Sequence, residues 1–152
     1  MGSISPATKR AITASDINSL KTLLKDTSAT ILAPTDEGYE SSIHRWSRAA
    51  EKPAGVVLAP TSAEEVSIAL KYASESGIDV AVKGGGHSTA GVSSTDGGLL
   101  VDLNAKMRGV SVADWEGGVK AFKVQGGATW GDVDKEGVKL GLATVGGTVA
   151  DT

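Results

Sequence analysis

The chain has 152 residues, a net charge of −3 at pH 7 and 40% apolar residues. This length predicts one domain with enough chain to bury a core, and the apolar content excludes the disordered class. No basic stripe is present, so we expect no nucleic-acid partner. The chain has no cysteine, which excludes disulfides and thiolate metal sites.

No targeting signal is evident in the sequence. The first ten residues lack the apolar run of a secretory signal, and no apolar run approaches the length that crosses a bilayer. We therefore expect no membrane partner; the missing signal favours the cytoplasm only weakly and leaves the compartment open. The sequence stops inside a glycine-rich stretch, residues 146–152, which is typical of a truncated chain.

Helical spacing of apolar residues predicts a first helix over residues 16–24, with Ser15 or Asp16 as its N-cap. A short apolar piece follows at residues 31–32. Residues 36–44 are polar and poorly periodic, so no regular element is expected there.

A second helix is predicted to start after residue 60, where two capping boxes overlap. They pair Thr61 with Glu64 and Ser62 with Glu65, so both glutamates are best explained as caps. Gly77 ends this helix. The apolar face between these limits comprises Val66, Ala69, Leu70 and Ala73.

Continuous apolar runs at residues 56–59 and 78–82 flank this helix and predict two buried strands. Strand, helix and strand at this spacing form a βαβ unit, so the two strands should be parallel and the crossover right-handed. A third strand is expected over residues 99–103.

An antiparallel layer is predicted to begin after residue 107. Alternating apolar residues at 110–112 and 119–124 flank a glycine turn and indicate a hairpin. A helix over residues 129–140 should follow, with Thr129 and Asp132 as its capping box. The side chains available for burial in this helix are Trp130, Val133 and Val138.

The segment Lys83-Gly84-Gly85-Gly86-His87-Ser88 follows the second predicted strand. Successive backbone N–H groups can converge on phosphate oxygens only where side chains leave room, so the segment is interpreted as a pyrophosphate cradle. The alternative is an ordinary tight turn. The segment is not a Walker loop, because Lys83 precedes the glycines.

His87 is one of two histidines and lies at the rim of the proposed cradle. A neutral imidazole nitrogen is a nucleophile, so His87 is interpreted as a functional residue. His44, in contrast, is expected to be structural. No second His or Cys lies at ligand spacing, so no metal site is predicted. No Ser-His-Asp arrangement or pair of catalytic carboxylates is evident, and no catalytic residue is assigned.

Several further motifs occur in order along the chain. They are Val57-x-x-Pro60, Glu64-Glu65-Val66, Gly77-Ile78, Gly91, Val101-Asp102-Leu103, Gly126-Gly127-Ala128-x-Trp130 and Gly146-Gly147-Thr148. With the segment at 83–88, these motifs make the chain similar to the amino-terminal part of FAD-linked oxidases of the berberine-bridge-enzyme and 6-hydroxynicotine-oxidase type. The resemblance runs from about Trp46 to Thr152.

The resemblance implies how a cofactor would be held. The residues that it assigns to FAD are Lys83, Gly84, Gly85, Gly86, His87, Ser88, Gly91, Gly146, Gly147 and Thr148. His87 matches the histidine that is bonded to the flavin 8α-methyl carbon in this family. Some members add a cysteinyl link at the position of Val149, and its absence here implies attachment through histidine alone.

The resemblance also implies an α+β fold of the PCMH (vanillyl-alcohol-oxidase) type, in which a small parallel βαβ layer is followed by an incomplete antiparallel layer. Residues 1–45 would form a helical lead-in and residues 46–106 the first FAD-binding subdomain. Residues 107–152 would begin the second, truncated subdomain.

A complete relative would oxidise an alcohol, amine or sugar-like substrate by hydride transfer to FAD and pass the electrons to oxygen. Its substrate pocket and catalytic base would come after residue 152. This chain alone is therefore expected to be inactive, to bind FAD poorly and to need the missing portion or a partner chain. The alternative is a catalytically silent domain that binds flavin or a nucleotide, or only a partner.

Overall fold

The computed structural model describes residues 9–152, so the expectation about a signal at residues 1–8 lies outside the described part. No helix in the described part is both long and apolar enough to cross a membrane. The elements are α1 (Ala14–Leu23), β1 (Thr30–Leu32), α2 (Tyr39–Ile43), η1 (Arg48–Ala50), β2 (Val56–Ala59), α3 (Ala63–Glu75), β3 (Val80–Lys83), β4 (Leu99–Asp102), β5 (Val110–Asp114), η2 (Glu116–Gly118), β6 (Lys120–Val124) and α4 (Trp130–Leu140).

Four strands form one sheet in the order β1-β2-β4-β3. β2 and β3 both run parallel to β4, which lies between them, and β1 pairs antiparallel with β2. The predicted direction of the two strands around α3 is thus confirmed, but they are not neighbours. β5 and β6 form the separate antiparallel pair that the hairpin pattern predicts. The α+β fold class is confirmed.

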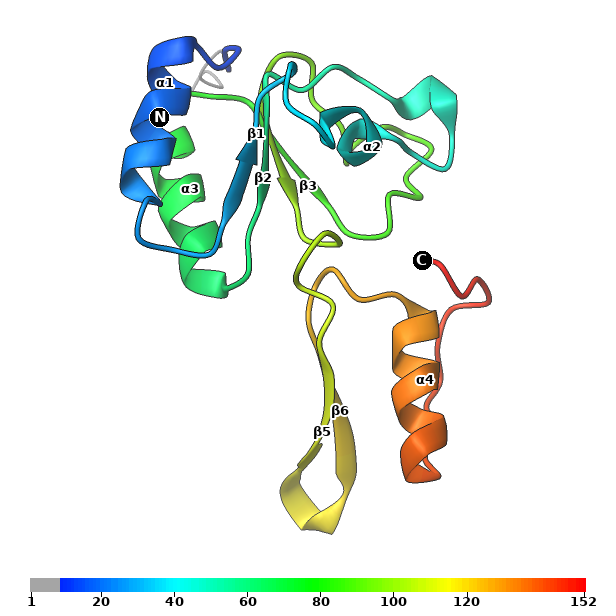
Figure 1. Ribbon diagram of the computed structural model, residues 1–152. Coiled ribbons are helices and arrows are strands. Elements are labelled where there is room, and N and C mark those ends of the chain that lie inside the picture. Colours follow the sequence, from blue (N-terminus) through cyan, green and yellow to red (C-terminus); the bar gives the residue numbers. More distant parts are fainter. Residues whose placement is uncertain (1–8) are drawn as a thin grey trace, which may run out of the picture.

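The sheet is buried on both faces, which explains the continuous apolar runs. Val56, Leu58 and Val101 pack on one face against α1 and α3, while Val57 and Leu100 pack on the other against α2. Figure 1 shows α1 and α3 on one side of the sheet and α2 on the other. Consecutive residues of one strand therefore belong to different cores.

Some predicted core positions are wrong. β3 lies at the edge of the sheet and alternates instead of being buried throughout, so Val82 is 44% exposed while Lys83 is buried. Leu70 on α3 and Val138 on α4 are also exposed. Val133 is buried, as expected.

The helix starts depart from the sequence predictions in detail. The N-cap of α1 is Thr13, not Ser15 or Asp16, and Asp16 completes its capping box from inside the helix. α3 uses only one predicted cap, Ser62, and its Glu65 carboxylate accepts hydrogen bonds from Thr61 rather than from Ser62. The predicted capping box of α4, Thr129 with Asp132, is confirmed.

One helix was missed. α2 forms within the polar stretch 36–44 and follows Gly38, whose φ of +88° is a left-handed conformation that favours glycine. Tyr39 anchors it, because its buried hydroxyl donates a 2.5 Å hydrogen bond to the Ala54 carbonyl. A five-residue helix with one apolar anchor carries too little periodicity to be recognised in the sequence.

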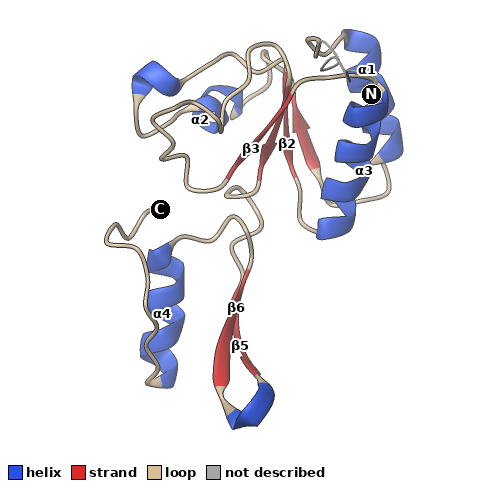
Figure 2. Cartoon of the chain, turned by 180° about the vertical axis from the view of Figure 1, so that it is seen from behind, coloured by secondary structure: helices blue, strands red, loops and turns tan. Residues whose placement is uncertain are grey.

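The hairpin and α4 extend from one end of the sheet (Figure 2). Side chains of both elements, among them Phe122 and Val133, line a cavity of about 420 Å³ between them. Trp115 at the hairpin turn is 68% exposed. This second layer is joined to the first mainly through the segments that lead into and out of the hairpin.

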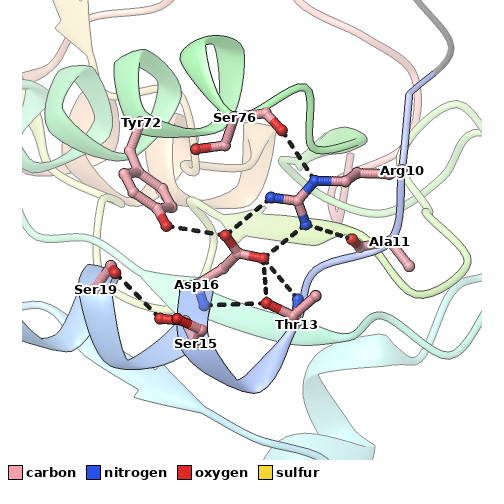
Figure 3. A network of polar contacts seen from close by, with 8 residues as sticks. All are labelled: Arg10, Ala11, Thr13, Ser15, Asp16, Ser19, Tyr72 and Ser76. Carbon is pink, nitrogen blue, oxygen red and sulfur yellow. Dashed lines mark hydrogen bonds and ion pairs between the residues drawn. The ribbon is translucent and has the colours of Figure 1, made fainter.

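A polar network fixes the start of the described chain to α3 (Figure 3). Arg10 donates two hydrogen bonds to the Asp16 carboxylate, at 2.7 and 2.9 Å, and a third to the Ser76 carbonyl. The hydroxyls of Thr13 and Tyr72 also donate to this carboxylate. These contacts, led by the Arg10 hydrogen bonds, hold the pKa of Asp16 far below its usual value.

The substitution Asp16→Asn is expected to lower the free energy of unfolding by roughly 1–3 kcal/mol, because it removes a charged acceptor from a nearly buried network. Urea unfolding at pH 7 measures this loss. The control is Asp26→Asn, since the Asp26 side chain is 88% exposed and lies 3.9 Å from Lys25, and it should change little. Equal losses in both variants would contradict the role of Asp16.

The network also predicts a pH dependence. Because folding lowers the pKa of Asp16, the unfolded chain takes up a proton below its own pKa of about 3.9 that the folded chain does not. The stabilisation is therefore complete above about pH 5 and is lost as the pH falls below about 4. Urea midpoints measured against pH should lose part of this acid slope in Asp16→Asn.

Candidate functional site

The carboxyl ends of β3 and β4 meet at one edge of the sheet and carry a buried ion pair. Lys83 and Asp102 lie opposite each other in the strand register, and Lys83 Nζ is 2.8 Å from Asp102 Oδ2. The other carboxylate oxygen, Asp102 Oδ1, is buried without a hydrogen-bond partner among the described residues. The predicted site residue Lys83 therefore turns its ammonium group inward.

Arg45 lies beside this ion pair and is itself 7% exposed. Its guanidinium donates to the carbonyls of Ser42, His44 and Ser93, at 3.1, 2.7 and 2.6 Å. Burial lowers the pKa of Arg45, an effect that the Asp102 carboxylate opposes. Arg45 thus joins the segment after α2 to the loop before β4.

The glycine segment passes over these two cations. Gly86 has a φ of +79°, and a Cβ atom there would lie 3.4 Å from Lys83 Cε and 3.5 Å from Arg45 Cδ. Among residues 9–152, no protein acceptor receives the backbone N–H groups of residues 84–88. Bare glycine amides without acceptors fit the oxygens of a diphosphate, so the donor set suits the predicted cradle.

His87 follows the glycines and is contacted on two sides. Its ring stacks on Trp46, with 6.0 Å between the centroids and 22° between the planes. Its Nε2 atom is 3.5 Å from Asp151 Oδ2. The imidazole is thus contacted by one residue that precedes β2 and by one residue near the end of the described chain.

The last residues of the chain close the other side. The first two N–H groups of α4, from Trp130 and Gly131, donate to the carbonyls of Thr152 and Ala150, at 2.9 and 2.6 Å. A Cβ atom at Gly85 would lie 2.9 Å from the Asp151 carbonyl oxygen. A side chain at position 85 would therefore collide with the backbone of Asp151, and glycine allows the last residues of the chain to lie this close to the glycine segment.

The remaining predicted cofactor residues do not line the cavity that contains His87. Gly91 has a φ of +73° and forms a turn with Ser88, whose carbonyl accepts its N–H at 3.3 Å. Gly146 and Gly147 pack against the ring of Trp130, where a Cβ atom would come within 2.7 Å of the ring. The exposed Thr148 continues this stretch toward Ala150. Their contact with a cofactor stays a prediction.

A cavity of about 580 Å³ lies between the glycine segment and α4. Its lining residues are Trp46, Gly85, His87, Asn104, Arg108, Thr129, Gly131, Lys135, Ala150 and Asp151. Of these, only Gly85 and His87 were predicted as site residues. No local motif marks the others, because they come from four separate stretches that only the fold brings together.

Arg108 is fixed within this lining by α4. Its Nε and one terminal nitrogen donate to the two oxygens of Asp132, at 2.9 and 2.8 Å. These bonds, with those from Thr129, lower the pKa of Asp132 to about 2. No group of three or more His, Asp or Glu side chains in residues 9–152 is arranged to hold a metal ion.

The buried ion pair can be tested by a double-mutant cycle. The substitution Lys83→Met should lower the free energy of unfolding by about 3 kcal/mol, because it leaves the Asp102 carboxylate buried and unpaired. Adding Asp102→Leu should restore most of the loss, since two apolar side chains can replace a buried pair. Urea unfolding of the four proteins gives the coupling energy, and additive losses would contradict the pairing.

Comparison with known proteins identifies the domain. A family model described as "FAD binding domain" matches residues 54–151. The (R)-6-hydroxynicotine oxidase of Paenarthrobacter nicotinovorans is 31% identical over 118 residues, which cover 77% of this chain and 25% of that protein. The chain thus spans about a quarter of this relative's length.

Solved structures agree with this assignment. The crystal structure of 6-hydroxy-D-nicotine oxidase from Arthrobacter nicotinovorans superposes with a TM-score of 0.73 at 27% identity, covering 82% of this chain and 26% of that one. Chitooligosaccharide oxidase also gives 0.73, at 26% identity, covering 90% and 28%. The predicted resemblance is confirmed: the chain belongs to the FAD binding domain family of FAD-linked oxidoreductases.

Proposed function

We propose that this chain forms the FAD-binding part of an oxidoreductase that oxidises a small alcohol, amine or sugar-like substrate by hydride transfer to the flavin and passes the electrons to oxygen. The observation that carries this proposal is the glycine segment, whose free N–H groups and His87 lie together at the cavity. The similar oxidases act, by their names, on a hydroxynicotine and on a chitooligosaccharide, which supports this substrate range.

The backbone amides of residues 84–88 would hold the FAD pyrophosphate, because no protein acceptor receives them in the described chain. Lys83 would act below the loop rather than as a direct ligand, since its ammonium pairs with Asp102. Gly91 and Gly146 to Thr148 would line the rest of the cofactor. FAD itself supplies the acceptor for the substrate hydride.

His87 would carry the flavin covalently. FAD would supply the 8α carbon to which an imidazole nitrogen would bond, and the two hydrogens and two electrons that this bond releases, one hydrogen from the methyl group and one from the imidazole N–H, would leave to dioxygen as hydrogen peroxide. Placement of His87 at the cavity, between Trp46 and Asp151, supports this role. The bond would keep the cofactor attached and favour hydride acceptance.

We also propose the division of the chain into residues 46–106 and 107–152 as two parts of one flavin site. The sheet belongs to the first part and the hairpin with α4 to the second, and the cavity is lined from both. The lead-in, residues 1–45, contributes α1, α2 and β1 to the first part.

The covalent bond is tested with the purified protein in its full natural length. Wild-type protein should retain yellow flavin after acid precipitation and show the mass of one added FAD. His87→Ala should release all flavin to the supernatant, whereas His44→Ala should retain it, because the His44 side chain is 60% exposed and its Nδ1 atom lies 3.2 Å from Glu51 Oε1. Acid-stable flavin in His87→Ala, or none in wild type, would contradict the assignment.

A further inference from the structure

Two residues that contact the glycine segment, residues 83–88, precede the part of the chain matched by the family model, which begins at residue 54. They are Arg45 and Trp46, on the irregular segment between α2 and η1. Arg45 lies beneath the loop and Trp46 lies beside it. The pair therefore approaches His87 from outside the matched domain.

Arg45 holds this segment in place. Its guanidinium donates to three carbonyls: that of Ser42 in α2, that of His44 in its own segment and that of Ser93 in the loop before β4. A planar fork of donors can satisfy such a set in one orientation only. The backbone at residue 45 is therefore fixed relative to the sheet.

Trp46 connects this fixed backbone to the glycine segment through two contacts. Its backbone N–H donates a 3.3 Å hydrogen bond to the Gly86 carbonyl, and its indole stacks on the His87 imidazole. The indole is 68% exposed, so burial within its own core does not account for its orientation. Both contacts come from Trp46, and they reach two successive residues, Gly86 and His87.

The contact with the Trp46 indole restricts the rotation of the His87 imidazole ring about χ2. The χ2 torsion of histidine is soft, so an unsupported ring samples many orientations at small cost. Bond formation to a carbon atom requires one nitrogen lone pair to point at that atom, and a misplacement of about 1 Å costs about 100-fold in rate. An indole against one ring face, with Asp151 at the Nε2 edge, limits the ring to a narrow range.

We propose that Arg45 and Trp46 are positioning residues that orient the His87 imidazole for attachment to the flavin. This inference rests on the proposed covalent role of His87. Trp46 acts on the ring directly, and Arg45 acts through Trp46. Neither residue is a binding group for the cofactor.

The first experiment follows flavin attachment over time after FAD is added to apoprotein of full natural length. Trp46→Ala should slow the appearance of acid-stable flavin by about 10-fold to 100-fold, while Trp46→Phe, which keeps an aromatic face, should restore most of the rate. Arg45→Lys keeps the charge but loses the fork and should also be slow. Trp115→Ala is the matched control, since Trp115 is also 68% exposed and lies at the hairpin turn.

A second experiment separates positioning from cofactor binding. In the His87→Ala background no bond can form at residue 87, and adding Trp46→Ala should leave the Kd for FAD unchanged. A weaker Kd there would show that Trp46 is a flavin-binding surface and would overturn the inference. An attachment rate in Trp46→Ala equal to that of wild type would overturn it as well.

A third measurement does not depend on the flavin. In the apoprotein, NMR signals of the His87 ring protons should carry a ring-current shift from the indole, which Trp46→Ala removes and Trp115→Ala preserves. If wild-type protein forms no covalent flavin, the proposed function fails, and this shift still decides whether Trp46 holds the imidazole. Absence of the shift would overturn the inference on its own.

Discussion

The contact between Lys83 Nζ and Asp102 Oδ2 closes the carboxyl edge of the sheet where the glycine segment begins. Two parallel strands end there, and the ion pair fixes their ends in register. A buried lysine without its carboxylate would be costly, so the sheet edge keeps one geometry. Gly86 lies against the Lys83 and Arg45 side chains, so the glycine segment rests on this fixed edge of the sheet.

Much of the fold can be predicted from local patterns in the sequence. The strands at 56–59 and 99–102, the hairpin and the capping box of α4 each depend on residues within one short stretch, and all are present. The insertion of β4 between β2 and β3 depends on pairing between distant segments, which no local pattern records. The cap at Thr13 was missed although its spacing to Asp16 is the same as that of Thr129 to Asp132, so here the sequence did carry the local signal.

The candidate site, like the fold, could be predicted from the sequence only in part. Glycines before His87 mark a loop with free amides because bare backbone is visible in the sequence. The wall opposite the loop, with Asn104, Arg108 and Lys135, carries no motif and depends on where α4 lies. The sequence does not indicate that Trp46 contacts His87, because 41 positions separate the two residues and the fold alone brings their rings together.

The sheet that is buried on both faces has a consequence for local stability. Val57 and Leu58 are neighbours in β2 but belong to opposite cores, so the two cores share one set of strand hydrogen bonds. Exchange of the amide hydrogens of β2 and β4 with solvent therefore requires both cores to open together. Protection of these amides then reports a single cooperative unit that extends from α1 and α3 to the edge where the glycine segment begins.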